Sequence, residues 1–332
     1  MITLGMSHNI PLNRFAKELA GYKIIEPKQP FAVFAKDEAL KAISCCDAFI
    51  TMVDFPCDKE MLDAGVKLKV VGNLGSGFDN VDVAEATKKG VLVLNTPQSV
   101  VAPTSEMTMT LILSICRNVV WYDRTFRADR TCHKNLLLER DMCLEGKTLG
   151  ILGFGRIGKA VAQKALAFGM HILYYDVYRA PENVEKDLHA TFVDDPETVL
   201  KQADVVTIHM AYTPESRHFI NKQRLSLMKP TAYLVNASRG PIVSEEDLYE
   251  CLLNHGIRGA ALDVHESEPH VSEKIASLEN VVITPHICTN IAEVRLNMFG
   301  ELVTGLCGWL GKGIVPTNLV NKDVLIQRNN KC

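Results

Sequence analysis

The residues with the greatest capacity for chemistry stand in one short stretch, ALDVHESEPH at positions 261–270. Its ionisable side chains are those of Asp263, His265, Glu266, Glu268 and His270. Carboxylates and imidazoles bind metal ions and also carry general acid–base catalysis. The same residue types coat solvated loops. The stretch alone therefore leaves three interpretations open: a metal site, an acid–base site and a hydrophilic loop.

Two further segments lead to ionisable residues in a similar way. The apolar run AYLVNA (232–237) is followed by Arg239, and the run VVIT (281–284) is followed by His286. If these runs are parallel strands of one sheet, their carboxyl ends lie at the edge where such sheets bind ligands. There an arginine can hold a carboxylate and polarise the adjacent carbonyl, while a histidine, oriented by an acid, moves a proton. The set favours redox chemistry of 2-hydroxy and 2-oxo acids.

A glycine-rich turn upstream predicts a phosphate cradle. The strand-like run TLGILG (148–153) continues into GFGRIG, in which Gly153, Gly155 and Gly158 form a GxGxxG pattern, and a helix-like stretch follows at once. The first glycine permits a tight turn, the second lets a pyrophosphate approach the backbone, and the third lets helix and strand pack closely. The amino end of the helix offers free N–H groups to phosphate.

An acid at the end of the next strand indicates which dinucleotide is preferred. Asp176 closes the run HILYYD (171–176), where a carboxylate would accept hydrogen bonds from both ribose hydroxyls. It would repel a 2′-phosphate, so NAD is favoured over NADP. Arg179 follows closely and weakens this preference, since an arginine can accommodate a 2′-phosphate.

Short apolar runs alternate with amphipathic stretches along the chain, which is typical of parallel sheets with helices on both faces. We predict strands at 48–53, 69–74, 91–95, 148–153, 171–176, 204–209, 232–237, 259–264 and 281–284. Residues 104–120 predict one long apolar helix with Thr104, Ser105 and Glu106 as its N-terminal cap. Residues 290–310 predict a terminal amphipathic helix. The fold class is therefore α/β, with one domain followed by a larger one.

Composition limits the classes of protein. A chain of 332 residues is too long for one ordinary core, and its 47% hydrophobic content is that of a globular protein. A net charge of −3 without a basic run argues against a general affinity for nucleic acid or anionic membrane. The sequence has no signal-peptide pattern at its start, and no run reaches the roughly 20 apolar residues of a membrane span. Its ten scattered cysteines include no CxxC pair, which indicates free thiols in a reducing cytoplasm.

Several motifs, in order and at matching spacing, resemble the D-isomer-specific 2-hydroxyacid dehydrogenase family over nearly the whole chain. They are VVGNLGSGFDNVD (70–82), VLVLNTP (91–97), GKTLGILGFGRIG (146–158), VNASRGPIVSEEDL (235–248), GAALDVHESEP (259–269) and NVVITPHI (280–287). The resemblance implies an NAD-dependent oxidoreductase for a small 2-oxo or 2-hydroxy acid. Its catalytic positions fall on Arg239, Glu268 and His286, with His286 as the acid and base of hydride transfer at C2.

The resemblance also implies the binding contacts. The NAD contacts would be Gly153, Gly155, Arg156, Ile157, Gly158, Asp176, His209, Met210, Ser216, Ala237, Ser238, Arg239, Asp263 and His286. The substrate contacts would be Arg239 and the backbone N–H groups of Leu74, Gly75, Ser76 and Gly77. A GSG sequence after a strand suits an anion nest of this kind. No metal is expected.

The resemblance implies two doubly wound domains with the active site in the cleft between them. A Rossmann NAD domain at 103–287 would be inserted into a flavodoxin-like substrate domain made of 1–102 and 288–332. A homodimer through the NAD domains is also implied.

The opening stretch then separates into roles. Glu268 would pair with His286 rather than with His265, while Glu266 and His270 would be solvated. His265 departs from the family pattern, which usually has Phe or another bulky apolar residue at that position.

Two alternatives stay open. The first is an NAD(H)-sensing binding protein on the same fold, as the family's transcriptional corepressors are. The absence of a long polar tail or a basic surface weakens it. The second is a metal-dependent hydrolase built on residues 263–270, which is weakened because consecutive loop residues rarely converge on one ion and no HExxH pattern is present.

Overall fold

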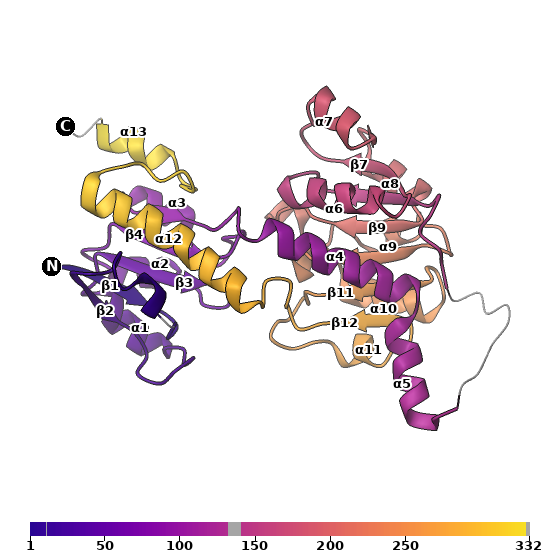
Figure 1. Cartoon of the computed structure of the whole chain (residues 1–332), viewed down its shortest axis with the longest axis horizontal. Helices are drawn as coiled ribbons and strands as arrows, with labels where there is room; N and C mark the ends of the chain where they lie inside the picture. The colour runs from indigo at the N-terminus through magenta and orange to yellow at the C-terminus, as the bar shows by residue number, and fades with distance from the viewer. Residues whose placement is uncertain (11, 132–140, 330–332) are drawn as a thin grey trace. The chain divides into compact units, whose positions relative to one another are not determined.

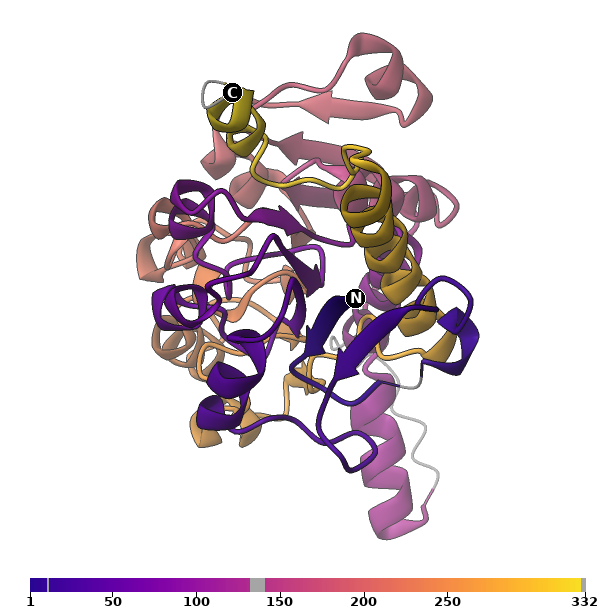
Figure 2. The ribbon, with the colours of Figure 1, turned by 90° about the vertical axis from the view of Figure 1, so that its left-hand side faces the viewer.

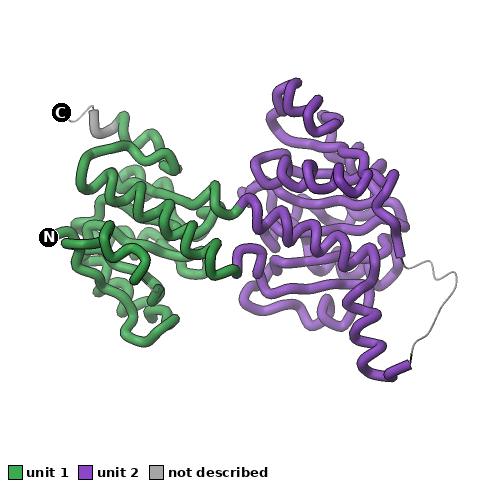
Figure 3. The backbone as a smooth tube through the Cα atoms, viewed as in Figure 1, with its two compact units in different colours: residues 1–100, 291–332 green, residues 101–290 purple. Residues whose placement is uncertain are grey.

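The computed structural model describes residues 1–10, 12–131 and 141–329, and it divides the chain into two compact units (Figure 1). Unit 1 comprises Met1–Val100 and Ile291–Cys332, and unit 2 comprises Val101–Asn290 (Figure 3). Each unit contains one parallel β-sheet with helices, so the predicted fold class is confirmed. No helix in the described ranges is long and apolar enough to cross a membrane.

Unit 1 is built on a five-stranded sheet in the order β2-β1-β3-β4-β5, with every pair parallel. Its strands are β1 (Ile2–Met6), β2 (Tyr22–Ile25), β3 (Ala48–Met52), β4 (Val70–Leu74) and β5 (Leu92–Leu94). Its helices are η1 (Asn13–Phe15), α1 (Lys36–Ile43), α2 (Lys59–Ala64), α3 (Val83–Lys88), α12 (Ala292–Lys312) and α13 (Asp323–Asn329). Strands β1 and β2 were not among the predicted strands, since neither carries the long apolar run of a central strand.

The two faces of this sheet are covered by different segments of the chain. Phe49 and Val71 pack into a core with residues of α1, α2 and α3. Helix α12 packs on β4 (Figure 2). Gly72 of β4 leaves room for Leu302 of α12, because a Cβ at position 72 would lie 3.3 Å from the Leu302 side chain. The terminal amphipathic helix therefore belongs to unit 1.

Unit 2 is built on a seven-stranded sheet in the order β12-β11-β10-β9-β6-β7-β8, again entirely parallel. Its strands are β6 (Thr148–Leu152), β7 (His171–Tyr175), β8 (Ala190–Phe192), β9 (Val205–Ile208), β10 (Tyr233–Asn236), β11 (Gly259–Leu262) and β12 (Val281–Ile283). Its helices are α4 (Val101–Cys116), α5 (Val119–Asp129), α6 (Arg156–Leu166), α7 (Glu182–Asp187), α8 (Pro196–Gln202), α9 (Lys222–Leu225), α10 (Glu245–Leu253) and α11 (Glu273–Ala276), with short 3₁₀ turns η2 (Pro214–Ser216) and η3 (Gly240–Ile242).

Alternating strand residues supply two separate cores in unit 2. Val205 and Val235 face one core with residues of α4 and α6, whereas Val206 and Leu234 face the other with residues of α8 and α10. This is the doubly wound arrangement, in which strands buried on both faces read as continuous apolar runs. The first strand, β6, lies in the middle of the sheet, with β7 on one side and β9 on the other. The strand order reverses there, so this is the switch point at which such sheets bind ligands.

The long apolar helix predicted at 104–120 is wrong at both ends. Helix α4 begins at Val101, so Thr104, Ser105 and Glu106 lie inside it, and the Ser105 hydroxyl donates to the Ala102 carbonyl at 2.8 Å rather than capping a start. The helix ends at Cys116, because Asn118 has a left-handed backbone with φ 48° and α5 begins after it. Serine and threonine side chains can cap the start of a helix, but inside a helix their hydroxyl groups can also donate to backbone carbonyls. The sequence alone does not distinguish these two positions.

Candidate active site

The ionisable residues of unit 2 gather along one edge of its sheet. His286 follows β12, Glu268 follows β11 and Arg239 follows β10, and these three strands are consecutive neighbours. His209 follows β9, the glycine-rich turn follows β6, and Asp176 follows β7. Because all seven strands are parallel, every one of these residues lies at the carboxyl edge.

Glu268 and His286 form the hydrogen-bonded pair at this edge. His286 Nδ1 lies 2.9 Å from Glu268 Oε2, while the backbone N–H of His265 donates to Glu268 Oε1 at 3.0 Å. Burial acts to raise the pKa of Glu268, but the hydrogen bond and charge of His286, aided by His265, hold that pKa below its ordinary value. Glu268 is therefore a carboxylate that orients the imidazole. The His286 side chain keeps 31% of its surface exposed, which leaves it open to a ligand.

The segment carrying His286 is anchored by Asp263, which is fully buried. One carboxylate oxygen of Asp263 accepts from Thr284 Oγ1 at 2.6 Å and from the Ile287 N–H at 2.9 Å, and the other accepts from the Cys288 N–H at 3.1 Å. The His286 N–H also donates to the Asp263 carbonyl at 2.8 Å. Both carboxylate oxygens of Asp263 thus hold the turn after β12. Its predicted role as a cofactor contact stays a prediction.

Arg239 is placed by a turn that Asn236 organises. The Asn236 amide donates to the Arg239 carbonyl at 2.9 Å, and its side-chain oxygen accepts from the Ser238 N–H and hydroxyl at 3.1 and 2.9 Å. Arg239 is half-buried, and Ala237 beside it is 8% exposed. Gly240 follows, and a Cβ there would overlap the backbone of His265. The loops after β10 and β11 therefore touch through their backbones at a position that requires glycine.

The glycine-rich turn has the form that a pyrophosphate requires. Gly153 has φ 95°, and a Cβ on it would overlap the Met210 N–H, while a Cβ on Gly158 would overlap the Gly153 carbonyl. A Cβ on Gly155 would meet nothing within 4 Å. Protein packing explains the glycines at 153 and 158, whereas Gly155 faces open space beside the start of α6. Arg156 and Ile157 stand in the first turn of α6, whose N–H groups have no partner inside the helix.

The residues that follow β7 include Asp176, whose contact with a ribose stays a prediction. The Asp176 carboxylate accepts from the Phe154 N–H at 2.6 Å and from the Tyr178 N–H at 3.2 Å, so it lies against the glycine-rich turn. Arg179 is held by Glu185 in two bonds of 2.9 Å. The Tyr174 hydroxyl donates to the same carboxylate at 2.6 Å. Arg179, followed by Tyr174, lowers the pKa of Glu185 to about 2, so the arginine has a charged partner throughout the neutral range.

The loop after β9 contains the remaining predicted cofactor contacts. His209 Nε2 lies 3.0 Å from Thr207 Oγ1, and desolvation lowers the pKa of His209 to about 3, so this imidazole is neutral. Met210 is half-buried beside Gly153. Ser216 is 6% exposed, and its hydroxyl donates to carbonyls of its own loop, those of Ala211 and Thr213. Ser216 closes the turn, and its contact with cofactor stays a prediction.

In unit 1 the predicted carboxylate loop follows β4. Leu74 is buried at the strand end, and the Gly75 N–H donates to the Asn73 carbonyl at 2.9 Å, so that donor is used. The carbonyls of Ser76 and Gly77 accept from Asn95 and Asn73 side chains at 2.7 Å. Within the part of the chain that the structure describes, the backbone N–H groups of Ser76 and Gly77 donate to no protein acceptor. The N–H groups of Ser76 and Gly77 are therefore available for an anion, whereas that of Gly75 is not.

The sequence comparison decides the family. A model described as the D-isomer specific 2-hydroxyacid dehydrogenase, NAD binding domain, matches residues 109–288. The chain belongs to the D-isomer specific 2-hydroxyacid dehydrogenase family. This identification confirms the resemblance drawn from the motifs, and it makes a nicotinamide dinucleotide the cofactor of unit 2.

Three relatives cover most of this chain, and the name of one of them prints a cofactor. A glyoxylate reductase of Thermococcus litoralis is 40% identical over 304 residues, which cover 90% of each chain. The TT0316 protein of Thermus thermophilus is 34% identical, with a TM-score of 0.86 over 96% of this chain and 100% of its own. An NADPH-dependent glyoxylate/hydroxypyruvate reductase of Sinorhizobium meliloti is 25% identical, with a TM-score of 0.83 over 96% of both chains.

One prediction about the opening stretch of this dehydrogenase is wrong. Glu266 is not simply solvated: its Oε1 lies 2.5 Å from His218 Nε2 and 3.3 Å from Arg217, and its N–H donates to Glu245 at 2.8 Å. His270 is exposed. Spacing in sequence gave no signal for these contacts, because Arg217 and His218 come from the η2 loop and Glu245 from the start of α10.

The acids of the stretch therefore have protein partners. Asp263 holds the turn after β12, Glu266 holds His218, and Glu268 holds His286. Among the described residues, no three His, Cys, Asp or Glu side chains converge in a way that could hold a metal ion. What the edge offers instead is a charged arginine and an oriented imidazole.

Proposed function

We propose that the chain is an NAD-dependent D-2-hydroxyacid dehydrogenase that interconverts a small 2-oxo acid and its D-2-hydroxy acid. The observation that carries the proposal is the 2.9 Å bond between His286, which follows β12, and Glu268, which follows β11. The next strand in the sheet is β10, which leads to Arg239. A carbonyl that accepts a hydride also needs a proton donor and a positive charge beside its oxygen. His286, oriented by Glu268, can supply the proton, and Arg239 can supply the charge.

The role of the protein in the reduction follows from which atoms of His286 already have a hydrogen-bond partner. A bound reduced nicotinamide supplies the hydride to C2 of the substrate. Since Glu268 holds Nδ1 of His286, the other ring nitrogen, Nε2, donates the proton to the carbonyl oxygen. Arg239 binds the substrate carboxylate and stabilises the negative charge that develops on the oxygen, an effect commonly worth about 3 kcal/mol. In oxidation the neutral imidazole takes the hydroxyl proton back.

We assign NAD rather than NADP as the preferred cofactor. Asp176 puts a carboxylate beside the glycine-rich turn, where it would repel a 2′-phosphate. Arg179, the residue that could neutralise such a phosphate, is engaged by Glu185 in two parallel bonds. Because Glu185 already occupies donors of the Arg179 guanidinium and balances its charge, Arg179 would bind a second anion more weakly.

We assign unit 2 as the NAD-binding domain and unit 1 as the substrate-binding domain. The glycine-rich turn and Asp176 lie in unit 2, and the loop at 74–77 with its two available N–H groups lies in unit 1. The substrate class is a small 2-oxo acid. Glyoxylate and hydroxypyruvate come first for testing because the names of two relatives include them.

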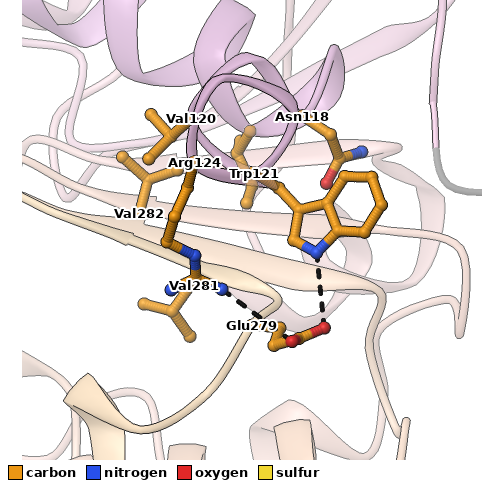
Figure 4. A pocket seen from close by; sticks show the side chains of 8 residues that line it. Asn118, Val120, Trp121, Arg124, Glu279, Val281 and Val282 are labelled. Atoms are coloured by element: carbon orange, nitrogen blue, oxygen red, sulfur yellow. Dashed lines mark hydrogen bonds and ion pairs between the residues drawn. The ribbon is translucent and has the colours of Figure 1, made fainter. Parts of the chain in front are cut away.

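We also propose that the protein is a homodimer through unit 2. Helix α5 contributes nothing to the buried core, and Val119, Val120 and Phe126 on it are each about half exposed. Its first turn is fixed to the sheet around a small pocket, where Trp121 donates to Glu279 at 3.3 Å and Arg124 lies 3.9 Å from the same carboxylate (Figure 4). A firmly seated helix with apolar residues in water suits a contact with a second copy.

The test is a panel of 2-oxo acids assayed with NADH and with NADPH, following loss of reduced-cofactor absorbance. We expect turnover with glyoxylate, hydroxypyruvate or pyruvate, a D product from hydroxypyruvate or pyruvate, and a higher kcat/KM with NADH. Tight NADH binding without turnover of any acid at high protein concentration would contradict the dehydrogenase and favour the NAD(H)-sensing binding protein. Light scattering at micromolar concentration tests the dimer.

A further inference from the structure

His265 is an imidazole in a place where the family usually has an apolar ring, and its side chain is only 7% exposed. Its Nε2 lies 3.0 Å from the carbonyl oxygen of Thr284. A carbonyl only accepts hydrogen bonds, so Nε2 carries the hydrogen. Nδ1 is buried without a hydrogen-bond partner among the described residues, and it faces Glu245 Oε1 at 3.8 Å. A buried polar atom left in this way calls for a functional explanation.

The two bonds of His265 reach both members of the catalytic pair. Its backbone N–H donates to Glu268 Oε1 at 3.0 Å, leaving Oε2 for His286. Its side chain donates to the Thr284 carbonyl, which also accepts from the His286 N–H at 3.1 Å. A phenylalanine would keep the first bond, which comes from the backbone, and lose the second.

We propose that His265 is a positioning residue of the active site. It fixes the position of the Glu268 carboxylate relative to the turn that bears His286. The inference rests on the proposed function, since it concerns the geometry of the proton-transferring pair. Tight placement of this kind matters because a shift of about 1 Å in a reacting group can cost roughly 100-fold in rate.

The residue that Nδ1 of His265 faces, Glu245 at the start of α10, is itself fixed. Glu245 accepts from the Glu266 N–H at 2.8 Å and donates its own N–H to Glu266 at 3.2 Å. The ring of His265 therefore lies between the Thr284 carbonyl, to which it donates, and a carboxylate whose position is set by Glu266.

Two substitutions test the bond that the His265 side chain makes. His265→Phe removes the bond while filling the space with a ring of similar size. His265→Gln keeps an N–H that can reach Thr284. We expect kcat to fall about tenfold or more in H265F and by less than about threefold in H265Q. His270→Gln, an exposed residue of the same loop, is the control and should leave kcat unchanged.

A second readout does not depend on turnover. Histidine-selective NMR of the protein without substrate should show the ring signals of His286 displaced in H265F and unchanged in H265Q and H270Q. NADH affinity should stay within about twofold in all three. An equal kcat in H265F and wild type would overturn the proposal, as would unmoved His286 signals in H265F. Failure of the proposed function would show instead as a wild type that reduces no 2-oxo acid.

Discussion

Nδ1 of His286 lies 2.9 Å from Oε2 of Glu268, across the carboxyl ends of the neighbouring strands β12 and β11. The bond joins residues that are 18 positions apart and decides which nitrogen of the ring can face a substrate. Asp263 holds the turn on one side and His265 holds Glu268 on the other. The reactive imidazole is thus fixed by two buried neighbours that do not themselves need to touch the substrate.

Removing the charge of Glu268 tests its role as partner. Because its pKa lies below 4.5, the side chain is ionised throughout the neutral range, and its contribution is lost only as the pH falls through that lowered value. Glu268→Gln keeps an acceptor for His286 and loses the charge that favours the imidazolium. We expect kcat for reduction to fall about 10- to 100-fold, and the decline of reduction at alkaline pH to begin at a lower pH. A pH profile of kcat that overlays that of wild type would contradict the pairing.

Two glycines of the phosphate cradle should respond differently to alanine. A Cβ on Gly155 meets nothing, so Gly155→Ala should leave thermal stability unchanged and weaken NADH binding, because the methyl group occupies the space of the pyrophosphate. A Cβ on Gly158 overlaps the Gly153 carbonyl, so Gly158→Ala should lower the melting temperature. Fluorescence titration with NADH and a thermal melt give both numbers. Unchanged NADH affinity in G155A would place the pyrophosphate elsewhere.

Releasing Arg179 should relax the cofactor preference. The Arg179 side chain is 63% exposed and is held by Glu185, so Glu185→Gln frees a guanidinium near the ribose end of the site. We expect the ratio of the NADP⁺ to the NAD⁺ dissociation constant to fall about tenfold, since an arginine can bind a 2′-phosphate. The double variant Arg179→Gln with Glu185→Gln is the matched control and should lose the gain. An unchanged ratio in E185Q would mean that Asp176 alone sets the preference.

The buried Asp263 carboxylate should be needed for stability and for the position of His286. Asp263→Asn replaces an acceptor oxygen with an amide that must face N–H or O–H donors, so we expect unfolding to become easier by about 1–3 kcal/mol. Thr284→Val removes one hydrogen bond and should cost about 1 kcal/mol. Urea unfolding measures both, with the exposed Thr231→Val as control. Wild-type stability in D263N would show that these bonds contribute little.

Much of the fold was predictable from the sequence, because each buried parallel strand is a continuous apolar run. Such a run can be recognised without knowing which strands lie beside it. Strands β6, β7 and β10 begin and end within a residue of the predicted runs. The edge strand β2 was missed because it is short and only half-buried, with Lys23 exposed. The start of α4 was missed because Ser105 suits a cap and a helix interior equally well.

The candidate site divides in the same way. The glycine-rich turn and the three residues after β10, β11 and β12 were predicted, because a parallel sheet brings its strand ends to one edge whatever the loops do. The contacts of Glu266 with His218 and of His265 with Glu245 and Thr284 were not. They join side chains from loops of unrelated sequence position, and only the packing of those loops, such as Gly240 on His265, determines which side chains meet.

The most direct test of the account is His286→Ala, measured for kcat with NADH and the best 2-oxo acid and, in parallel, for NADH affinity. If His286 delivers the proton, kcat should fall by about 10²- to 10⁴-fold while the NADH dissociation constant stays within about threefold of wild type. A kcat within a few-fold of wild type would contradict the account, because the bond between His286 and Glu268 would then have no part in the chemistry.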